Sequence, residues 1–258
     1  MTTAIDLLSD GRGGTAPTPL FVHAHPDDET LQTGGLIAWL TGRQINCDLV
    51  TCTRGERGEI VPGVMPSSIT TADLIRVRGR ELAGALHILG ISGHFWLGMP
   101  PARRAGYSPR QYRDSGMRWV AEGQAGPIET ADPDTFTSAD PDEAYADLLA
   151  LVQAVEPSVL VGYDRGGSYG HPDHLRAHEL TRRVARQAGV GLVEVASRPE
   201  DPGFTWFDFP EQRATVIAAL RCHATQLTVR DDHLVHVGGQ RQAFPLRIGL
   251  RRVELDRA

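Results

Sequence analysis

One stretch decides the fold of this chain: LFVHAHPDDET, residues 20–30. It opens with a short apolar run, which predicts a buried β-strand, and the pattern of residues 31–40 behind it predicts a helix. Such a strand delivers the residues that follow it to the carboxyl edge of a sheet, where open α/β folds place their functional sites. Here those residues include two imidazoles and three carboxylates.

A second stretch repeats this pattern far downstream: VLVGYDRGGSYGHPDHL, residues 159–175. It also begins with an apolar run, and it leads into a helical pattern at residues 175–188. Two strand–loop–helix units can converge at one edge of one sheet, so we expect the two loops to meet. The alternative interpretation is structural, because acidic residues also stabilise helix N-termini and solvated histidines also occur in loops that enter helices.

The order of the predicted elements specifies the fold class. We expect strands at about 20–23, 46–53, 94–97, 158–163 and 191–195, alternating with helices at about 29–41, 71–89, 142–155, 175–188 and 210–223. This alternation predicts an α/β protein with a Rossmann-like, mostly parallel sheet flanked by helices. Residues 228–256 alternate like a small C-terminal β-hairpin that turns at Gly238-Gly239. No GxGxxG or Walker loop follows the first strand, which disfavours a nucleotide-binding site.

The length of the chain is sufficient for one domain with a sizeable core, and we expect a single domain over residues 1–258. Residues 1–18 are polar and rich in Gly and Thr, so we expect a loose leader. Residues 98–140 are rich in Pro and Gly and weakly periodic, which predicts a long active-site loop. Residues 197–209 are expected to form a further loop.

Composition argues against several classes of protein. A net charge of −6, with neutral histidines, does not favour binding to nucleic acid or to an anionic membrane. Every basic residue is Arg, so no Lys nucleophile, Schiff base or Walker-type Lys is available. Three scattered cysteines, with no recognisable signal peptide and no apolar run near the ~20 residues of a membrane span, favour a cytoplasmic protein with reduced thiols. The oligomeric state does not follow from the sequence.

The two loops together contain the donor set of a catalytic zinc site, which needs three protein ligands and one open position. His25 and Asp28 are three residues apart, so both can face the same side of a turn. With the distant His174 they would supply two imidazoles and one carboxylate. Zinc is the expected cofactor, and Fe(II) could replace it because N and O ligands suit both ions.

Four further side chains in these loops could act on a substrate. Asp27 is placed to take a proton from an attacking water. His171 can lie on the same side of the turn as His174, and Asp173 could hold the His171 imidazole charged, facing a developing oxyanion. Tyr169 is a further donor. These parts suit the hydrolysis of an amide or ester.

The motifs HPDDE, residues 25–29, and GHPDH, residues 170–174, resemble those of the LmbE/PIG-L family of zinc-dependent deacetylases. Members of this family remove the acetyl group from N-acetylglucosamine in conjugates. The resemblance covers about residues 19–190. It implies an enzyme that takes a small-molecule amino-sugar conjugate as its substrate.

For the site, the resemblance implies three zinc ligands: His25, Asp28 and His174. It implies that Asp27 is the general base. It also implies that His171 stabilises the tetrahedral intermediate and that Tyr169 assists.

Within the family, this chain most resembles the mycothiol-pathway branch, which acts on N-acetylglucosaminyl-inositol. The matching signatures include RDSGM, residues 113–117, and HATQ, residues 223–226. By this match Arg78, Asp114 and Glu56 would bind sugar or inositol hydroxyls. The alternative is that Arg78 lies on a solvated helix face and that Asp114 caps a loop.

Other branches of the family remain alternatives. Relatives that deacetylate pseudodisaccharides or other antibiotic intermediates fit the motifs equally. The mycothiol conjugate amidase carries a Lys where this chain has Gln32, which disfavours that activity. A catalytically silent sugar-binding relative is expected to lack the base or the oxyanion partner, whereas Asp27 and His171 are both present.

Overall fold

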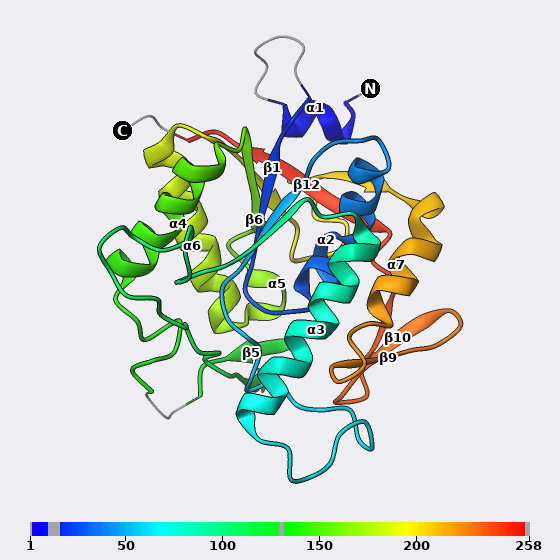
Figure 1. Ribbon diagram of the computed structural model, residues 1–258. Helices are drawn as coiled ribbons and strands as arrows, with labels where there is room; N and C mark the ends of the chain where they lie inside the picture. The colour runs from blue at the N-terminus through cyan, green and yellow to red at the C-terminus, as the bar shows by residue number, and fades with distance from the viewer. Residues whose placement is uncertain (1, 10–15, 129–131, 256–258) are drawn as a thin grey trace.

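A seven-stranded sheet forms the centre of the molecule (Figure 1). The structure is a computed structural model, and it describes residues 2–9, 16–128 and 132–255. In sheet order its strands are β3 (Gly93–Trp96), β2 (Asp48–Thr51), β1 (Pro19–His23), β6 (Val159–Tyr163), β7 (Gly191–Val195), β12 (Arg247–Val253) and β8 (Thr205–Asp208). The pairings among β3, β2, β1, β6 and β7 are parallel, whereas β12 runs antiparallel to both of its neighbours. The predicted α/β class with a mostly parallel sheet is therefore confirmed.

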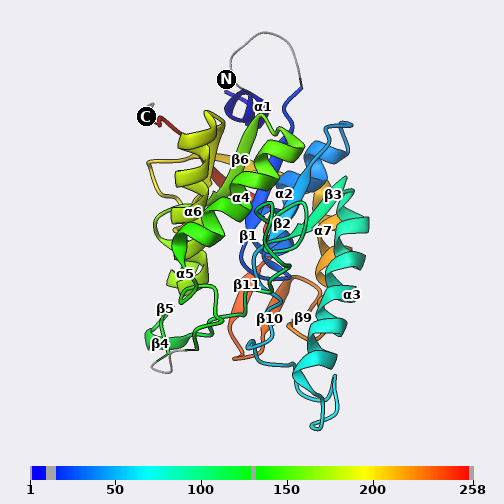
Figure 2. The ribbon, with the colours of Figure 1, turned by 60° about the vertical axis from the view of Figure 1, so that its left-hand side comes forward.

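Helices cover both faces of this sheet (Figure 2). One face packs on α4 (Pro141–Val155) and α6 (Pro172–Ala188), and the other on α2 (Asp28–Thr41), α3 (Thr71–Leu89) and α7 (Arg213–Leu220). In β1, Phe21 belongs to one core, and Leu20 and Val22 belong to the other. Burial on both faces explains why the parallel strands are nearly continuous apolar runs in the sequence.

Capping residues fix the helix ends close to where the sequence predicts them. α3 begins after Thr70, whose hydroxyl accepts a hydrogen bond from the backbone N–H of Asp73 at 3.1 Å, and ends at Gly90 in the left-handed conformation. α6 begins three residues earlier than expected, because Pro172 suits the first helical position and His171 is the N-cap.

Three segments are more ordered than expected. Helix α1 (Ala4–Leu8) packs into the core, where we expected a loose leader; residues 10–15 of that segment lie outside the described residues. Segment 98–140 contains a two-stranded hairpin, β4 (Arg118–Ala121) and β5 (Gln124–Gly126). Segment 197–209 contains the edge strand β8, and its pairing with the distant β12 is not visible in local sequence.

The C-terminal segment divides between two sheets. Strands β9 (Leu227–Val229), β10 (His233–His236) and β11 (Arg241–Ala243) form a small antiparallel sheet, and the predicted turn at Gly238-Gly239 joins β10 to β11. The short 3-10 helix η1 (Pro210–Gln212) precedes α7, which packs on this sheet. The last strand, β12, instead completes the central sheet, because its partners β7 and β8 lie there.

The chain changes direction across the sheet between β1 and β6. From β1 it proceeds outward through β2 to β3, and it then returns to place β6 on the other side of β1. A crevice at the carboxyl ends of the strands is expected at such a switch point. Both His- and Asp-rich loops follow these two strands.

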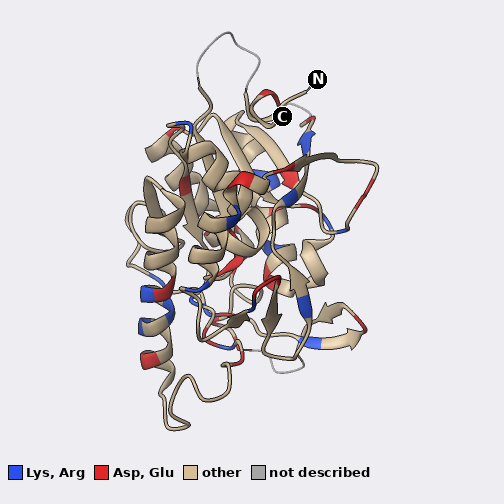
Figure 3. Ribbon diagram, turned by 90° about the vertical axis from the view of Figure 1, so that its right-hand side faces the viewer, with Lys and Arg blue, Asp and Glu red and all other residues tan. Residues whose placement is uncertain are grey.

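On the side of the molecule drawn in Figure 3, acidic and basic residues are interspersed along the chain rather than segregated by sign.

Candidate metal and catalytic site

Three donor atoms from the two loops form a nearly equilateral triangle. His25 Nδ1 lies 3.2 Å from Asp28 Oδ2 and 3.2 Å from His174 Nε2, and His174 Nε2 lies 3.3 Å from Asp28 Oδ2. Ligand atoms placed about 2.0–2.1 Å from a tetrahedral zinc ion are roughly 3.4 Å apart. The triangle therefore has the dimensions of three ligands around one metal, with the residues predicted from the sequence.

Hydrogen bonds on the far side of each imidazole assign its tautomer. His25 Nε2 donates to Asp173 Oδ2 at 3.1 Å, and His174 Nδ1 donates to the carbonyl oxygen of Gly167 at 3.1 Å. With these donors on the far side, each ring can present its other nitrogen without a proton to a metal ion, as metal-bound histidines do. All three side chains are buried or nearly so.

Tyr163, which the sequence analysis missed, supports two of the three candidate ligands. Its hydroxyl donates to Asp28 Oδ2 at 2.8 Å and accepts the backbone N–H of Ala24 at 2.9 Å. Its ring stacks on that of His174, with centroids 4.3 Å apart. The signal in the sequence was a tyrosine at the end of a buried strand, whose hydroxyl needs a polar partner.

The charges around Asp28 favour its ionised form. Burial alone would raise the pKa of Asp28, but the facing imidazoles of His174 and His25 outweigh it and hold that pKa well below its usual value. The carboxylate therefore presents a negative charge to the centre of the triangle.

Other acidic and imidazole groups surround the same centre. His171 has a donor atom within 4.8 Å of those of His25 and His174, and Asp114 and Asp173 form a similar group with His25 and His171. Asp173 and Asp114 use their carboxylates in hydrogen bonds with neighbouring loop residues. We therefore assign the inner ligands to the triangle and the other groups to its surroundings.

Asp27 occupies a strained position beside the triangle. It precedes α2 with a φ of 117°, a conformation that costs free energy for any residue other than glycine. Its backbone N–H donates to Glu29 Oε2 at 2.9 Å, and Glu29 is in turn held by His223 Nε2 at 2.8 Å. Burial and the adjacent Asp28 charge raise the pKa of Asp27 to about 8. The predicted general base is thus a partly buried residue next to the candidate ligands, with its backbone held by Glu29.

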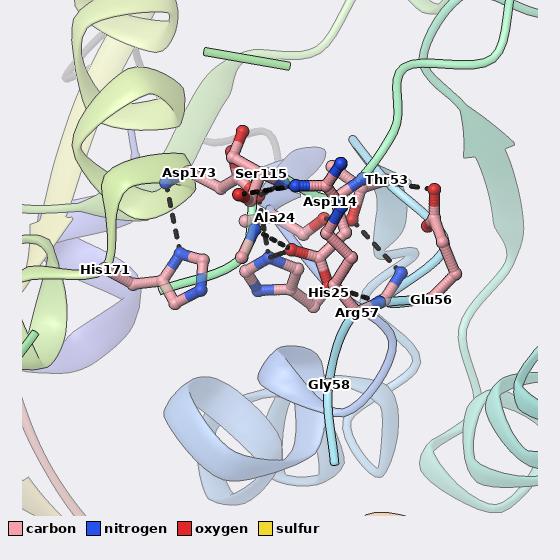
Figure 4. A network of polar contacts seen from close by, with 12 residues as sticks. Ala24, His25, Thr53, Glu56, Arg57, Gly58, Asp114, Ser115, His171 and Asp173 are labelled. Carbon is pink, nitrogen blue, oxygen red and sulfur yellow. Dashed lines mark hydrogen bonds and ion pairs between the residues drawn. The ribbon is translucent and has the colours of Figure 1, made fainter. Parts of the chain in front are cut away.

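His171 lies against the triangle, but its predicted partnership with the Asp173 carboxylate is wrong. The ring is 4.5 Å from that of His25, and its Nδ1 accepts the backbone N–H of Asp173 at 3.1 Å (Figure 4). Residues two apart in a helical turn face different directions, so the Asp173 side chain reaches His25 instead. Burial and the nearby imidazoles hold the pKa of His171 well below its usual value. His171 is accordingly a neutral imidazole with its donor at Nε2.

Tyr169 stands at the open side of the site. Its ring lies 5.3 Å from that of His174 and 5.7 Å from that of Trp119, and it is 37% exposed. Trp119 belongs to the unpredicted β4–β5 hairpin, and so this hairpin forms part of the entrance. Gln32 donates to the hydroxyl of Ser168 at 3.1 Å and fixes the turn before Tyr169.

Arg78, a predicted substrate-binding residue, has a different task in the structure. It is 1% exposed, and its guanidinium donates to the carbonyl oxygens of Gly55, Gly58 (3.0 Å) and Glu59 (2.7 Å). Both the predicted sugar contact and the alternative of a solvated helix face are therefore corrected. Arg78 lies on the buried face of α3, four residues after Leu74, and this spacing was the signal in the sequence.

Glu56 and Asp114 form an acidic rim next to the triangle. Glu56 Oε1 accepts the backbone N–H of Asp114 at 3.3 Å, while the buried Oε2 has no hydrogen-bond partner among the described residues. Asp114 accepts the backbone N–H groups of Arg57 at 3.2 Å and Gly116 at 2.7 Å, and its Oδ1 lies 3.8 Å from His25 Nε2. Asp114 thus caps a loop, as the alternative expected, and also borders the site.

The fold and this donor set define a class: α/β proteins with a mostly parallel sheet and a candidate single-metal hydrolytic centre at the switch point of the sheet. The sequence model of the PIG-L family, described as GlcNAc-PI de-N-acetylase, matches residues 20–185. That match includes more than half of the chain and both loops. The protein belongs to the PIG-L (LmbE) family.

Relatives with curated names support the same family. A protein of Kineococcus radiotolerans is 42% identical over 84% of this chain and 70% of its own length, and one of Saccharomonospora viridis is 36% identical over 88% and 91%. Both are named 1D-myo-inositol 2-acetamido-2-deoxy-alpha-D-glucopyranoside deacetylase. Among solved structures, N,N'-diacetylchitobiose deacetylase from Pyrococcus horikoshii is similar with a TM-score of 0.57, 18% identity, and coverage of 80% of this chain and 69% of its own. At that identity the likeness concerns the fold alone.

Proposed function

We propose that this protein hydrolyses the N-acetyl group of 1D-myo-inositol 2-acetamido-2-deoxy-α-D-glucopyranoside, or N-acetylglucosaminyl-inositol, to the free amine and acetate. The single observation that carries the proposal is the triangle of His25, Asp28 and His174 with Asp27 and His171 beside it. Metal-dependent deacetylation belongs to the family, and the substrate is taken from the names of relatives that match over most of their length.

The residues of the triangle would hold a divalent ion, and their two imidazoles and one carboxylate suit Zn²⁺ or Fe²⁺. When bound, such an ion polarises a carbonyl and lowers the pKa of water towards about 7. Both imidazoles use their far nitrogens in hydrogen bonds to oxygen atoms, which leaves the near nitrogens for the ion, and so the donor set fits it.

Asp27 accepts the proton of the attacking water in this proposal. The bond from its backbone N–H to Glu29 and the left-handed φ hold the backbone from which the Asp27 side chain extends. His171, neutral with its proton on Nε2, donates to the oxygen of the tetrahedral intermediate. Tyr169 supplies a second donor from the entrance, and this role follows from its position beside His171 and His174.

An open groove gives room for the second ring of the substrate. It has a volume of about 660 Å³ and extends from Glu56 along the start of α3 to the turn between β10 and β11 at Val237. Glu56 lines the groove where it meets the rim of the site, and its buried Oε2, which has no partner among the described residues, would accept a substrate hydroxyl after a small rotation of the side chain. A conjugate fills this groove, and free N-acetylglucosamine does not.

The test is the release of amine and acetate from N-acetylglucosaminyl-inositol, beside free N-acetylglucosamine and an N-acetylated pseudodisaccharide, with zinc-loaded and chelated protein. Metal-dependent turnover that favours the inositol conjugate is expected. In Val237→Trp, which narrows the groove, the KM for the conjugate rises while turnover of free N-acetylglucosamine is unchanged. Preferred turnover of the pseudodisaccharide would overturn the assignment of the substrate and retain the reaction.

Gln32 separates this proposal from the amidase alternative. The Gln32 side chain is engaged with Ser168 at 3.1 Å and carries no charge, where the amidase carries a Lys. Cleavage of a mycothiol conjugate in the same assay is therefore expected to be undetectable.

A further inference from the structure

Ser115 binds the Asp173 carboxylate through two different groups. Its backbone N–H donates to Asp173 Oδ2 at 2.9 Å, and its hydroxyl contacts Asp173 Oδ1 (Figure 4). Ser115 is 6% exposed and Asp173 is fully buried. This contact joins segment 98–140 to the first turn of α6, 58 positions apart in the sequence.

The hydroxyl group of Ser115 can donate its hydrogen bond to only one of its described partners, Asp173. Thr137 donates to Ser115 Oγ from its backbone N–H at 3.1 Å and from its hydroxyl at 2.9 Å. Because a serine hydroxyl carries a single hydrogen, and these two donors occupy its acceptor positions, that hydrogen points to Asp173 Oδ1. Asp173 therefore receives two hydrogen bonds from Ser115 in fixed directions.

The Asp173 carboxylate also accepts a hydrogen bond from His25. Asp173 Oδ2 accepts His25 Nε2–H at 3.1 Å, which leaves His25 Nδ1 free to face Asp28 and His174. A competing carboxylate is nearby, because Asp114 Oδ1 lies 3.8 Å from the same His25 nitrogen. The orientation of the His25 ring thus depends on which carboxylate holds it.

We propose that Ser115 is a positioning residue for the metal: it fixes Asp173, and Asp173 fixes the ring and tautomer of His25. The inference rests on the proposed metal site and deepens it. Removing a residue that orients a metal ligand through hydrogen bonds typically weakens metal binding 10–100-fold. Segment 98–140, which contributes no inner ligand, thereby determines how tightly the ion is held.

The test compares the full-length wild type with Ser115→Ala, Ser115→Thr and the control Ser92→Ala, which alters an exposed serine whose hydroxyl bonds Asn46. The dissociation constant of Zn²⁺ is measured at pH 7 by competition with a chromogenic chelator, without substrate. We expect Ser115→Ala to bind Zn²⁺ about 10–100-fold more weakly, while Ser115→Thr and Ser92→Ala stay within about twofold of wild type.

Thermal unfolding with and without Zn²⁺ separates positioning from a general loss of stability. We expect Ser115→Ala to reduce the rise in Tm that Zn²⁺ produces, because a weaker ligand stabilises less at a given concentration. An equal loss of Tm with and without Zn²⁺, together with wild-type Zn²⁺ affinity, would overturn the inference. If the wild type binds Zn²⁺ at the triangle but deacetylates none of the substrates tested, the proposed substrate fails and the role of Ser115 stands.

Discussion

Two walls enclose the candidate metal site, and they are built differently. The ligand wall, residues 25–29 and 171–174, follows two adjacent strands and directs its donor atoms at the centre. The outer wall, residues 54–59 and 112–117, directs its polar groups at other protein groups, and one of these, Asp173, holds the candidate ligand His25. In the proposed mechanism the ligand wall therefore supplies the reacting groups, and the outer wall helps to position them.

The two walls are also anchored differently. Sheet pairing and the first turns of α2 and α6 fix the ligand wall. The outer wall is held to α4 by a buried cluster in which Asp147 accepts from Arg103 at 2.8 Å and from the hydroxyl of Tyr112 at 2.8 Å. Substitutions in the ligand wall should therefore reduce rate, and those in the outer wall should change affinity or stability.

The largest effect is expected from Asp27→Asn in the ligand wall. The amide cannot take a proton, so kcat should fall by about 10²–10⁴-fold while Zn²⁺ remains bound. Metal analysis and steady-state kinetics on the same preparation check this, with Asp201→Asn as the control. A metal-replete Asp27→Asn protein with wild-type turnover would show that the base lies elsewhere.

Arg78→Met should have the next largest effect and reports on the outer wall. Three carbonyl groups lose their charged donor, so the free energy of unfolding should fall by about 2–3 kcal/mol. The KM should rise because Glu56 lies on the loop that Arg78 holds. Arg80→Met, on the exposed side of the same helix, provides the matched control for urea unfolding. Equal stability of both variants would contradict the role given to Arg78.

Tyr163→Phe tests a residue outside both walls, at the end of β6, that supports the ligand wall from behind. Removing the hydroxyl that donates to Asp28 should weaken Zn²⁺ binding by about 10–100-fold and leave the fold intact. Chelator competition measures this, and Tyr145→Phe serves as the control. Unchanged affinity would mean that the backbone N–H of His25 suffices to orient the Asp28 carboxylate.

The smallest effect is expected from Tyr112→Phe, whose hydroxyl faces α4 and not the candidate ligands. The loss of one buried hydrogen bond to Asp147 should cost about 1 kcal/mol of stability, with kcat unchanged. The exposed Tyr107→Phe is the control, and chemical denaturation is the measurement. A fall in kcat without a fall in stability would contradict the separation of the two walls.

The ligand wall could largely be predicted from the sequence, whereas the contacts of the outer wall could not. The candidate ligands His25, Asp28 and His174 follow from local rules, because strand ends and turn spacing place them at one sheet edge. The bounds of α3 follow from its apolar spacing and from Gly90. These are short-range features, and a single sequence carries them.

What the sequence did not reveal depends on contacts between distant segments. The partner of Asp173 is Ser115, and the last strand pairs with β7 and β8; no local pattern encodes either choice. Arg78 was misassigned because its charge suggested a ligand, although its spacing from Leu74 placed it on the buried face of α3. Long-range pairing therefore limited the prediction of the outer wall.

Two further expectations from the sequence concern membrane-spanning helices and disulfide bonds. Within the described residues, no helix combines the length and apolar character needed to cross a membrane. Cys47, Cys52 and Cys222 are free thiols.

Anomalous diffraction at the zinc edge, from crystals of the wild-type protein grown with Zn²⁺, tests the metal assignment most directly. We predict one peak about 2.0–2.2 Å from His25 Nδ1, Asp28 Oδ2 and His174 Nε2. A peak held by His171, Asp114 and Asp173 instead, with Asp28 uncoordinated, would contradict the triangle and the roles built on it.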